Sequence, residues 1–172
     1  VLNHINEEGI NITTLEDPVE YPMSMIRQTS VAETAKLDFA NGVRSMMRQD
    51  PDVILVGEIR DADTAEMAFR AAMTGHQVYS TLHTNSAIGA VPRLLDIGVL
   101  PDVMAGNIIG IIAQRLIRRL CDHCKSPYHA EPHEIRLLGD LGEGPRPVLF
   151  RATGCELCDF QGYRGRIAIM EL

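Results

Sequence analysis

Three short β-rich runs in the first half of the chain each lead into polar side chains. They cover residues 10–15, 53–56 and 77–82, are rich in β-branched residues, and are too short to be buried helices. The pattern therefore predicts strands. The run at 53–56 follows Pro51 and has no polar position, which predicts a central strand covered on both faces.

Apolar residues recur at three- and four-residue steps in the segments between and after these runs. This period predicts amphipathic helices over residues 34–48, from Asp61 or Asp63 to Gly75, over about 86–98 and over about 102–120. The last of these would bury Ile108, Ile111 and Ile112, and residues 22–30 have no clear period and are interpreted as a loop. Alternating strands and helices are typical of a wound α/β domain.

A titratable side chain follows each of the three predicted strands. Glu16 follows the first strand, Glu58 the second and His83 the third. If these strands are parallel neighbours, their carboxyl ends meet at one rim of the sheet, where open α/β sheets bind ligands. Carboxylates that hold water or a metal ion, beside an imidazole, can activate water against a phosphoanhydride. Taken singly, each strand can equally end on a solvated charge.

The residues at these strand ends resemble a known family, the motor ATPases of type II secretion and type IV pilus assembly, which are RecA-like hexamers. Residues 16–20 (EDPVE) are similar to its aspartate box, residues 56–61 (VGEIRD) to its Walker B motif and residues 80–85 (STLHTN) to its histidine box. The match continues through residues 113–116 and 161–166, so it covers nearly the whole chain. It implies an α/β fold with a partial RecA-like P-loop NTPase core.

The same resemblance implies ATP and magnesium as cofactors. It implies catalytic roles for Glu16, Glu58 and His83 and nucleotide contacts from Asp17, Arg60 and Thr84. For Arg60, an ion pair with Asp61 or Asp63 is the alternative interpretation. A parent protein of this kind is a cytoplasmic homohexamer held at the inner membrane by a platform protein and the secretion or pilus machinery, with no nucleic acid partner and no membrane span of its own.

One element of the family is missing from the sequence. No G-x-x-x-x-G-K-[ST] stretch is present, so the backbone cradle and the lysine that would hold phosphates are absent. Residues 1–6 resemble the end of the helix that follows this phosphate loop. We therefore expect a fragment that begins just past Walker A and that is inactive alone, although the parent protein is an ATPase.

The composition of the chain argues against some classes of partner and location. The 172 residues are 45% hydrophobic and carry a formal charge of −7, which argues against a general affinity for nucleic acid or anionic membrane. Neither an apolar run of bilayer length nor a signal peptide is found. The segment that comes nearest to such an apolar run, residues 108–113, is ended by Gln114 and Arg115.

The four cysteines of the chain form two C-x-x-C pairs, Cys121 with Cys124 and Cys155 with Cys158. Four thiolates complete a tetrahedral shell suited to zinc. Disulfides, a redox pair and bound iron are the alternatives, and the resemblance favours zinc because assembly-type secretion ATPases carry such a module. We expect a partial ATPase core over residues 1–120, an inserted metal-binding module over 121–158, and the start of a carboxyl-terminal region over 159–172.

Two functional hypotheses follow. In the first, the chain is part of a hexameric motor that hydrolyses ATP to power pilus assembly or protein secretion. In the second, it is a non-catalytic, zinc-bearing scaffold or interaction module of such a complex. The presence of Glu16, Glu58 and His83 together favours the first for the parent protein.

Overall fold

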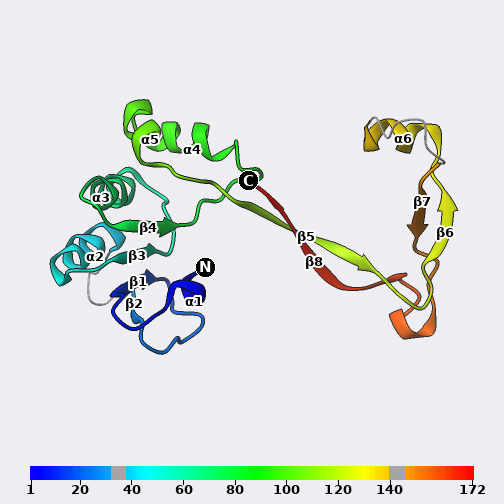
Figure 1. The fold of residues 1–172 in the computed structure, drawn as a ribbon, viewed down its shortest axis with the longest axis horizontal. Coiled ribbons are helices and arrows are strands. Elements are labelled where there is room, and N and C mark those ends of the chain that lie inside the picture. The colour runs from blue at the N-terminus through cyan, green and yellow to red at the C-terminus, as the bar shows by residue number, and fades with distance from the viewer. Residues whose placement is uncertain (32–37, 140–145) are drawn as a thin grey trace. The chain divides into compact units, whose positions relative to one another are not determined.

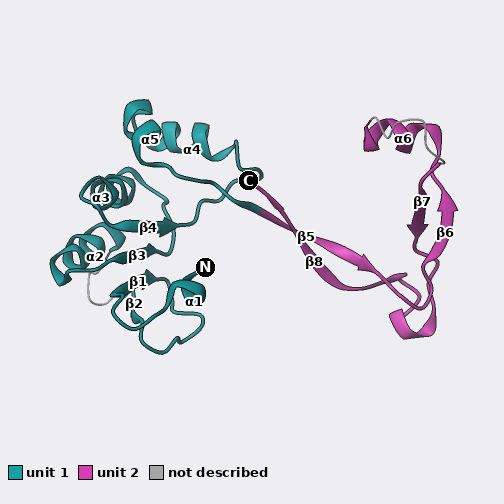
Figure 2. Ribbon diagram, in the orientation of Figure 1, with its two compact units in different colours: residues 1–113, 172 teal, residues 114–171 magenta. Residues whose placement is uncertain are grey.

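The computed structural model describes residues 1–31, 38–139 and 146–172. This part of the chain forms two compact units, one of residues 1–113 with Leu172 and one of residues 114–171 (Figure 2). The division of the sequence at residues 120 and 158 stays a prediction, because a compact unit is not by itself a domain of a parent protein. Within the described ranges, no helix has both the length and the apolar character needed to cross a bilayer.

A parallel four-stranded sheet lies at the centre of the first unit (Figure 1). Its order is β2 (Arg27–Ser30), β1 (Ile12–Glu16), β3 (Val53–Val56) and β4 (Gln77–Ser80). The predicted α/β class is confirmed, and the three β-rich runs form strands that are parallel neighbours, the condition on which the predicted rim depends. Strand β2 corrects the interpretation of residues 22–30 as a loop. Its sequence, RQTS, is polar and mostly exposed at the sheet edge, so it has no hydrophobic alternation to reveal it.

In the described part of the first unit, five helices precede, connect or follow these strands. They are α1 (Leu2–Ile5), α2 (Phe39–Met46), α3 (Ala62–Met73), α4 (Ala90–Ile97) and α5 (Pro101–Asn107), with a short 3-10 helix at Met47–Gln49. Asp61 caps α3 as predicted, since its carboxylate accepts the N–H of Thr64 at 2.8 Å. The predicted helix over 34–48 begins within residues 32–37, which lie outside the described residues. Its described part forms α2, capped by Asp38.

The core of this unit lies between the sheet and helices α2 and α3. Leu15, Ile54 and Val56 on the sheet are fully buried in this core. Gly42 on α2 lets the helix approach, because a Cβ there would lie 2.3 Å from Cδ2 of Leu15. Burial on both faces explains why the central strand β3 is a continuous apolar run.

The predicted helix over residues 102–120 is wrong beyond Asn107. The chain turns extended at Ile108 (φ −84°, ψ 114°), and residues 113–120 form strand β5 (Ala113–Leu120). Isoleucines at 108, 109, 111 and 112, with Gly110 between the two pairs, disfavour helix and favour extended chain. Of the residues expected in the core here, Ile112 is 61% exposed and Ile108 and Ile111 are only half-buried, so that expectation is corrected as well.

The second unit is built from strands rather than from a sheet covered by helices. Strand β5 pairs with β8 (Tyr163–Glu171), and β6 (Ser126–His129) pairs antiparallel with β7 (Val148–Arg151). Helix α6 (Pro132–Leu138) follows β6, and a 3-10 helix (Glu156–Cys158) precedes β8. Both C-x-x-C pairs occupy the short connections between the two strand pairs.

Candidate functional site

The carboxyl ends of β1, β3 and β4 are tied together around Gly57. Its N–H donates to the carbonyl of Leu15 at 2.7 Å, and the hydroxyl of Thr81 donates to its carbonyl at 2.7 Å. A Cβ at position 57 would lie 2.9 Å from the Leu15 carbonyl oxygen and 3.2 Å from Cα of Glu16. Glycine therefore permits the close approach that delivers Glu58 to the rim.

Glu58 is the centre of the candidate active site. One of its oxygens, Oε2, accepts from Nε of Arg60 at 2.5 Å and lies 3.1 Å from Nε2 of His83. The Glu58 side chain is only 13% exposed, whereas those of Arg60 and His83 are 61% and 83% exposed. The structure thus brings together three of the predicted site residues. The Arg60 salt bridge is to Glu58, and not to Asp61 or Asp63 as the alternative interpretation had it.

The electrostatics of this cluster favour an ionised Glu58. The hydrogen bond from Arg60 lowers the pKa of Glu58, burial opposes that shift, and His83 adds to the lowering. The hydrogen bond to Glu58 in turn raises the pKa of Arg60, with a smaller contribution from the negative charge of Asp17. An ionised carboxylate with one oxygen held by donors can orient a water through the other and accept its proton.

Glu16 lies at the end of the neighbouring strand, and its contacts point toward β2. Its Oε1 accepts from the hydroxyl of Thr14 at 2.5 Å and from the side-chain amide of Gln28 at 3.0 Å. No hydrogen bond joins Glu16 to Glu58 in the described part of the chain. The Thr84 hydroxyl donates to the Ser86 carbonyl at 3.1 Å, so it serves its own loop here.

Sequence reasoning assigned no role to two residues that support the site. Thr81 bonds the Gly57 turn, and Gln28 contacts Glu16. Thr81 lies inside the histidine-box segment and could have been found there. Gln28 offered no signal, because its strand lacks a hydrophobic period.

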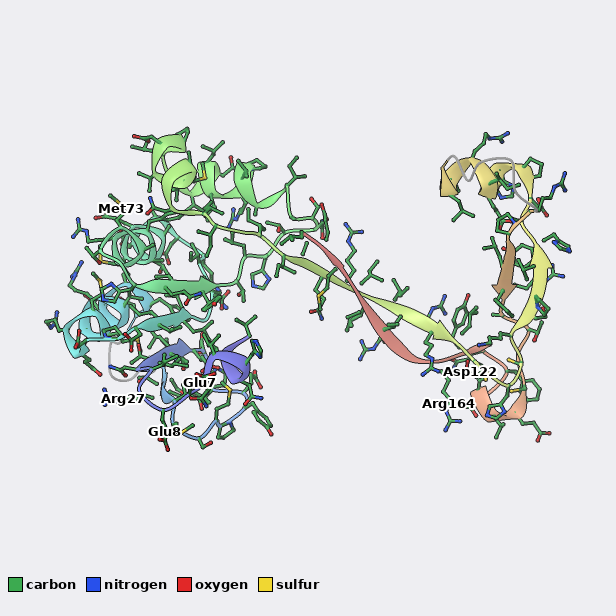
Figure 3. The ribbon with its side chains drawn as sticks, viewed as in Figure 1. Glu7, Glu8, Arg27, Met73, Asp122 and Arg164 are labelled. Atoms are coloured by element: carbon green, nitrogen blue, oxygen red, sulfur yellow. The ribbon has the colours of Figure 1, made fainter. Side chains whose placement is uncertain are left out.

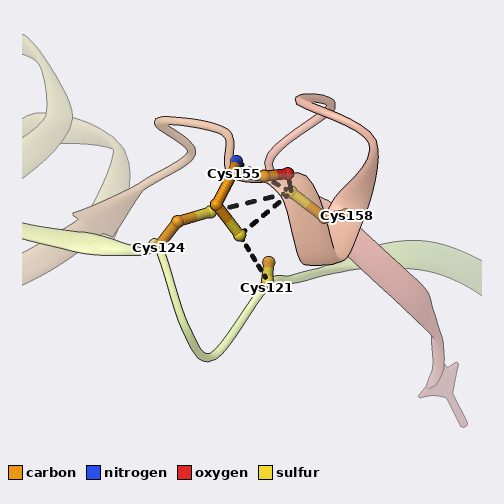
Figure 4. A group of neighbouring side chains, drawn as sticks. All are labelled: Cys121, Cys124, Cys155 and Cys158. Atoms are coloured by element: carbon orange, nitrogen blue, oxygen red, sulfur yellow. Dashed lines mark hydrogen bonds between the residues drawn. The ribbon is translucent and has the colours of Figure 1, made fainter.

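The candidate metal centre consists of Cys121, Cys124, Cys155 and Cys158, whose sulfurs all lie within 4.8 Å of one another (Figure 4). The Sγ atoms are 4.0 Å apart for Cys121 and Cys155, and 3.8 Å apart both for Cys124 and Cys158 and for Cys155 and Cys158. Four sulfurs about 2.3 Å from one tetrahedral zinc ion would lie about 3.8 Å apart. The donor set and its geometry therefore fit zinc.

The surroundings of Cys158 favour its thiolate form, whereas those of Cys155 favour the neutral thiol. Burial raises the pKa of Cys158, but N–H groups of Cys155 and Gly162 donate to its sulfur and bring the pKa down to about 7. Burial, followed by hydrogen bonding to Cys158, raises the pKa of Cys155 to about 11. A bound cation would favour the thiolate form of both, since thiolates are the ligands.

Asp122 forms ion pairs with two basic side chains next to the cysteines. Asp122, between the first two cysteines, accepts from Lys125 at 2.7 Å and from Arg119 at 2.5 Å. The hydrogen bond from Lys125 is the largest cause of the lowered pKa of Asp122. Asp122 and Arg164 both lie where the β5–β8 ribbon meets these loops (Figure 3). No carboxylate of the described residues joins the four sulfurs, so the cluster is an all-thiolate set.

Comparison with known proteins identifies relatives along the whole chain. The family model described as "Type II/IV secretion system protein" matches residues 1–172. The type II secretion system protein E of Pseudomonas aeruginosa is 52% identical, and the type II secretion system ATPase E of Vibrio cholerae is 48% identical, each over 99% of this chain. The chain spans about a third of the length of these curated relatives, 34% of each.

A solved structure shares the fold. The crystal structure of the pilus retraction motor PilT with bound ADP is 36% identical and superimposes with a TM-score of 0.62. The match covers 87% of this chain and 40% of that one.

Proposed function

The chain belongs to the type II/IV secretion system protein family. We propose that it is the part of a motor ATPase that carries the residues for ATP hydrolysis, at the carboxyl ends of the sheet strands, and a zinc-binding module. The parent protein hydrolyses ATP to power type II protein secretion or type IV pilus assembly. Two observations support this proposal: relatives of nearly half identity are named ATPases, and a related motor was crystallised with bound ADP.

The observation that carries the proposal is the convergence of Arg60 and His83 on one oxygen of Glu58 at the carboxyl edge of a parallel sheet. That edge is where nucleotides bind in α/β folds. In our proposal Glu58 orients the attacking water and accepts its proton, while His83 holds Glu58 and faces the terminal phosphate. Glu16 is the second catalytic carboxylate. Asp17, Arg60 and Thr84 contact the nucleotide and its magnesium ion.

The remaining features of the proposal follow from the family and from the cysteines. ATP and magnesium are the cofactors of hydrolysis, and zinc is the structural metal held by the four thiolates. We propose that six copies of the parent protein assemble in the cytoplasm. They are held at the inner membrane by the platform protein and the rest of the secretion or pilus machinery.

The test measures ATP turnover in the parent protein that contains the phosphate loop. Glu58→Gln and Glu16→Gln should each lower kcat by on the order of a hundredfold or more while leaving nucleotide affinity intact. Glu66→Gln is the matched control, because Glu66 forms an exposed ion pair with Arg70 on α3 and has no part in the site. Wild-type turnover in both site variants would overturn the proposal and favour a non-catalytic scaffold.

A further inference from the structure

Gln28 links Glu16 to the loop that precedes β2. Its side-chain nitrogen Nε2 donates to Oε1 of Glu16 at 3.0 Å and to the carbonyl of Tyr21 at 3.1 Å. Its side-chain oxygen Oε1 accepts the N–H of Met23 at 2.6 Å. One amide thus contacts a strand-end carboxylate and two points of a loop.

The chemistry of the partners allows one orientation of this amide. The Glu16 carboxylate and the Tyr21 carbonyl can only accept, and the Met23 N–H can only donate. Turning the amide over would set two acceptors against its oxygen and a donor against its nitrogen. Both N–H groups and one lone pair of Gln28 are used in the observed arrangement, so the contact is directional and self-consistent.

Thr14 and Gln28 hold the Glu16 side chain among the described residues, and of these two Gln28 alone comes from another segment. Thr14 lies on the same strand, two residues earlier, and moves with it. Gln28 reaches across from β2, where it pairs in register with Thr14. Among the described contacts, Gln28 is therefore what fixes the Glu16 carboxylate relative to its neighbours.

We infer that Gln28 is a positioning residue for Glu16 and couples the placement of that carboxylate to the loop at residues 21–23. The inference rests on the proposed function, because it assigns Gln28 to the same hydrolytic site. Gln28 touches no reacting atom. It acts by holding Glu16 in one geometry, and a misplacement of about 1 Å at such a site can cost on the order of a hundredfold in rate.

The first experiment removes the amide without changing its size. In the parent protein, Gln28→Met should lower kcat for ATP by about ten- to a hundredfold and leave KM within about twofold, because nucleotide binding is unchanged. Gln77→Met is the matched control. Gln77 lies on β4 of the same sheet and donates to the Tyr79 hydroxyl at 2.6 Å, at the opposite end of its strand from the rim, so its variant should keep wild-type kcat.

The second experiment uses pH to separate positioning from simple loss of stability. Gln28→Glu keeps an acceptor for the Met23 N–H but places a second carboxyl group against that of Glu16. Glu16 is the titratable side chain that contacts position 28, since Tyr21 contributes only its backbone carbonyl. The introduced carboxyl can donate to Glu16 only when protonated. The kcat ratio of Gln28→Glu to wild type should therefore rise as pH falls from about 8 to about 6, whereas that of Gln28→Met should stay constant.

The third experiment needs no activity and uses this chain as it is. Hydrogen exchange at the Met23 amide should accelerate in Gln28→Met and stay near wild type in Gln28→Glu, which keeps the acceptor. Equal exchange in wild type and Gln28→Met would overturn the coupling to the loop.

The outcomes separate the two proposals. If Glu16→Gln abolishes turnover while Gln28→Met keeps wild-type kcat, the positioning role is wrong and the hydrolytic site stands. If Glu16→Gln and Glu58→Gln both keep wild-type turnover, the proposed function fails whatever Gln28 does. A pH-independent ratio for Gln28→Glu would likewise refute the donor role.

Discussion

Replacing Cys155 with serine, or removing metal with a chelator, is expected to unfold the second compact unit locally and leave the first unit folded. In the described part of residues 114–171, the buried apolar side chains are Cys121, Ala130 and Cys158. Two of these three are themselves candidate ligands. The described part of this unit therefore has almost no hydrophobic core, and we expect its order to depend on a metal ion that joins the four sulfurs.

The magnitudes decide which contribution dominates. At about 0.8 kcal/mol per buried CH₂, three side chains of this size contribute a few kcal/mol at most. Structural zinc in small peptides contributes about 10–16 kcal/mol at neutral pH. Loss of the metal should thus exceed what the apolar contacts can offset. The first unit keeps its own buried cluster around Leu15, Ile54 and Val56 and should not respond.

Hydrogen exchange followed by mass spectrometry measures this directly. Amides held by the cysteine loops, those of Lys125 and Phe160, should exchange at least about a hundredfold faster after chelation, which corresponds to about 2.7 kcal/mol of local stability. Amides of β1 and β3 should be unchanged. Glu156→Gln, between two of the cysteines but not a candidate ligand, is the control for Cys155→Ser.

Metal analysis supplies the refuting result. Protein prepared under reducing conditions with zinc in the medium should contain one zinc ion per chain, and X-ray absorption should report four sulfurs at about 2.3 Å. Absence of stoichiometric metal, or a nitrogen and oxygen shell, would falsify the site. Unchanged exchange after complete metal removal would refute the reasoning about stability even if zinc binds.

Three further predictions concern the first unit. Gly57→Ala should destabilise the chain by about 1–3 kcal/mol in urea unfolding, because the new Cβ would meet the Leu15 carbonyl. Gly106→Ala in α5 is the control and should be neutral or slightly stabilising, because a Cβ there meets nothing within 4 Å. Equal effects of the two substitutions would contradict the close-approach argument. The pKa of Glu58 is lowered in the folded state, so its pairing stabilises the fold above the ordinary carboxyl pKa and is lost as pH falls through the lowered value. Arg60→Gln should therefore flatten the fall of melting temperature between about pH 5 and about pH 3, which the exposed-pair variant Arg70→Gln should not do. The chain alone should hydrolyse ATP negligibly, because its sequence has no phosphate loop; turnover above background that Glu58→Gln abolishes would contradict this.

Much of the first unit was predictable because its signals are local. Strand β3 is a continuous apolar run, and the period of α3 together with its Asp61 cap marks a helix from the sequence alone. The rim followed from parallel pairing. The sequence therefore predicts that Glu58 and His83 lie near one another, but it does not predict the 3.1 Å contact between their side chains.

What the sequence could not indicate depends on partners distant along the chain. Leu116 and Ile117 satisfy a helical period, but pairing of β5 with β8, some forty residues later, makes them part of a ribbon. Gln28 is unremarkable until β2 is seen beside β1. The spacing of the two cysteine pairs leaves several chemistries open, and only the distances between their sulfurs single out one tetrahedral shell.

The role of Glu58 as the group that activates water is tested most directly by following the fate of bound nucleotide in a single turnover. Parent protein carrying Glu58→Gln is mixed with a limiting amount of radiolabelled ATP, quenched at successive times and analysed for ATP and ADP. The account predicts that the variant binds nucleotide as wild type does and keeps it as ATP, with hydrolysis slowed by on the order of a hundredfold or more. Conversion of bound ATP to ADP at the wild-type rate would contradict it.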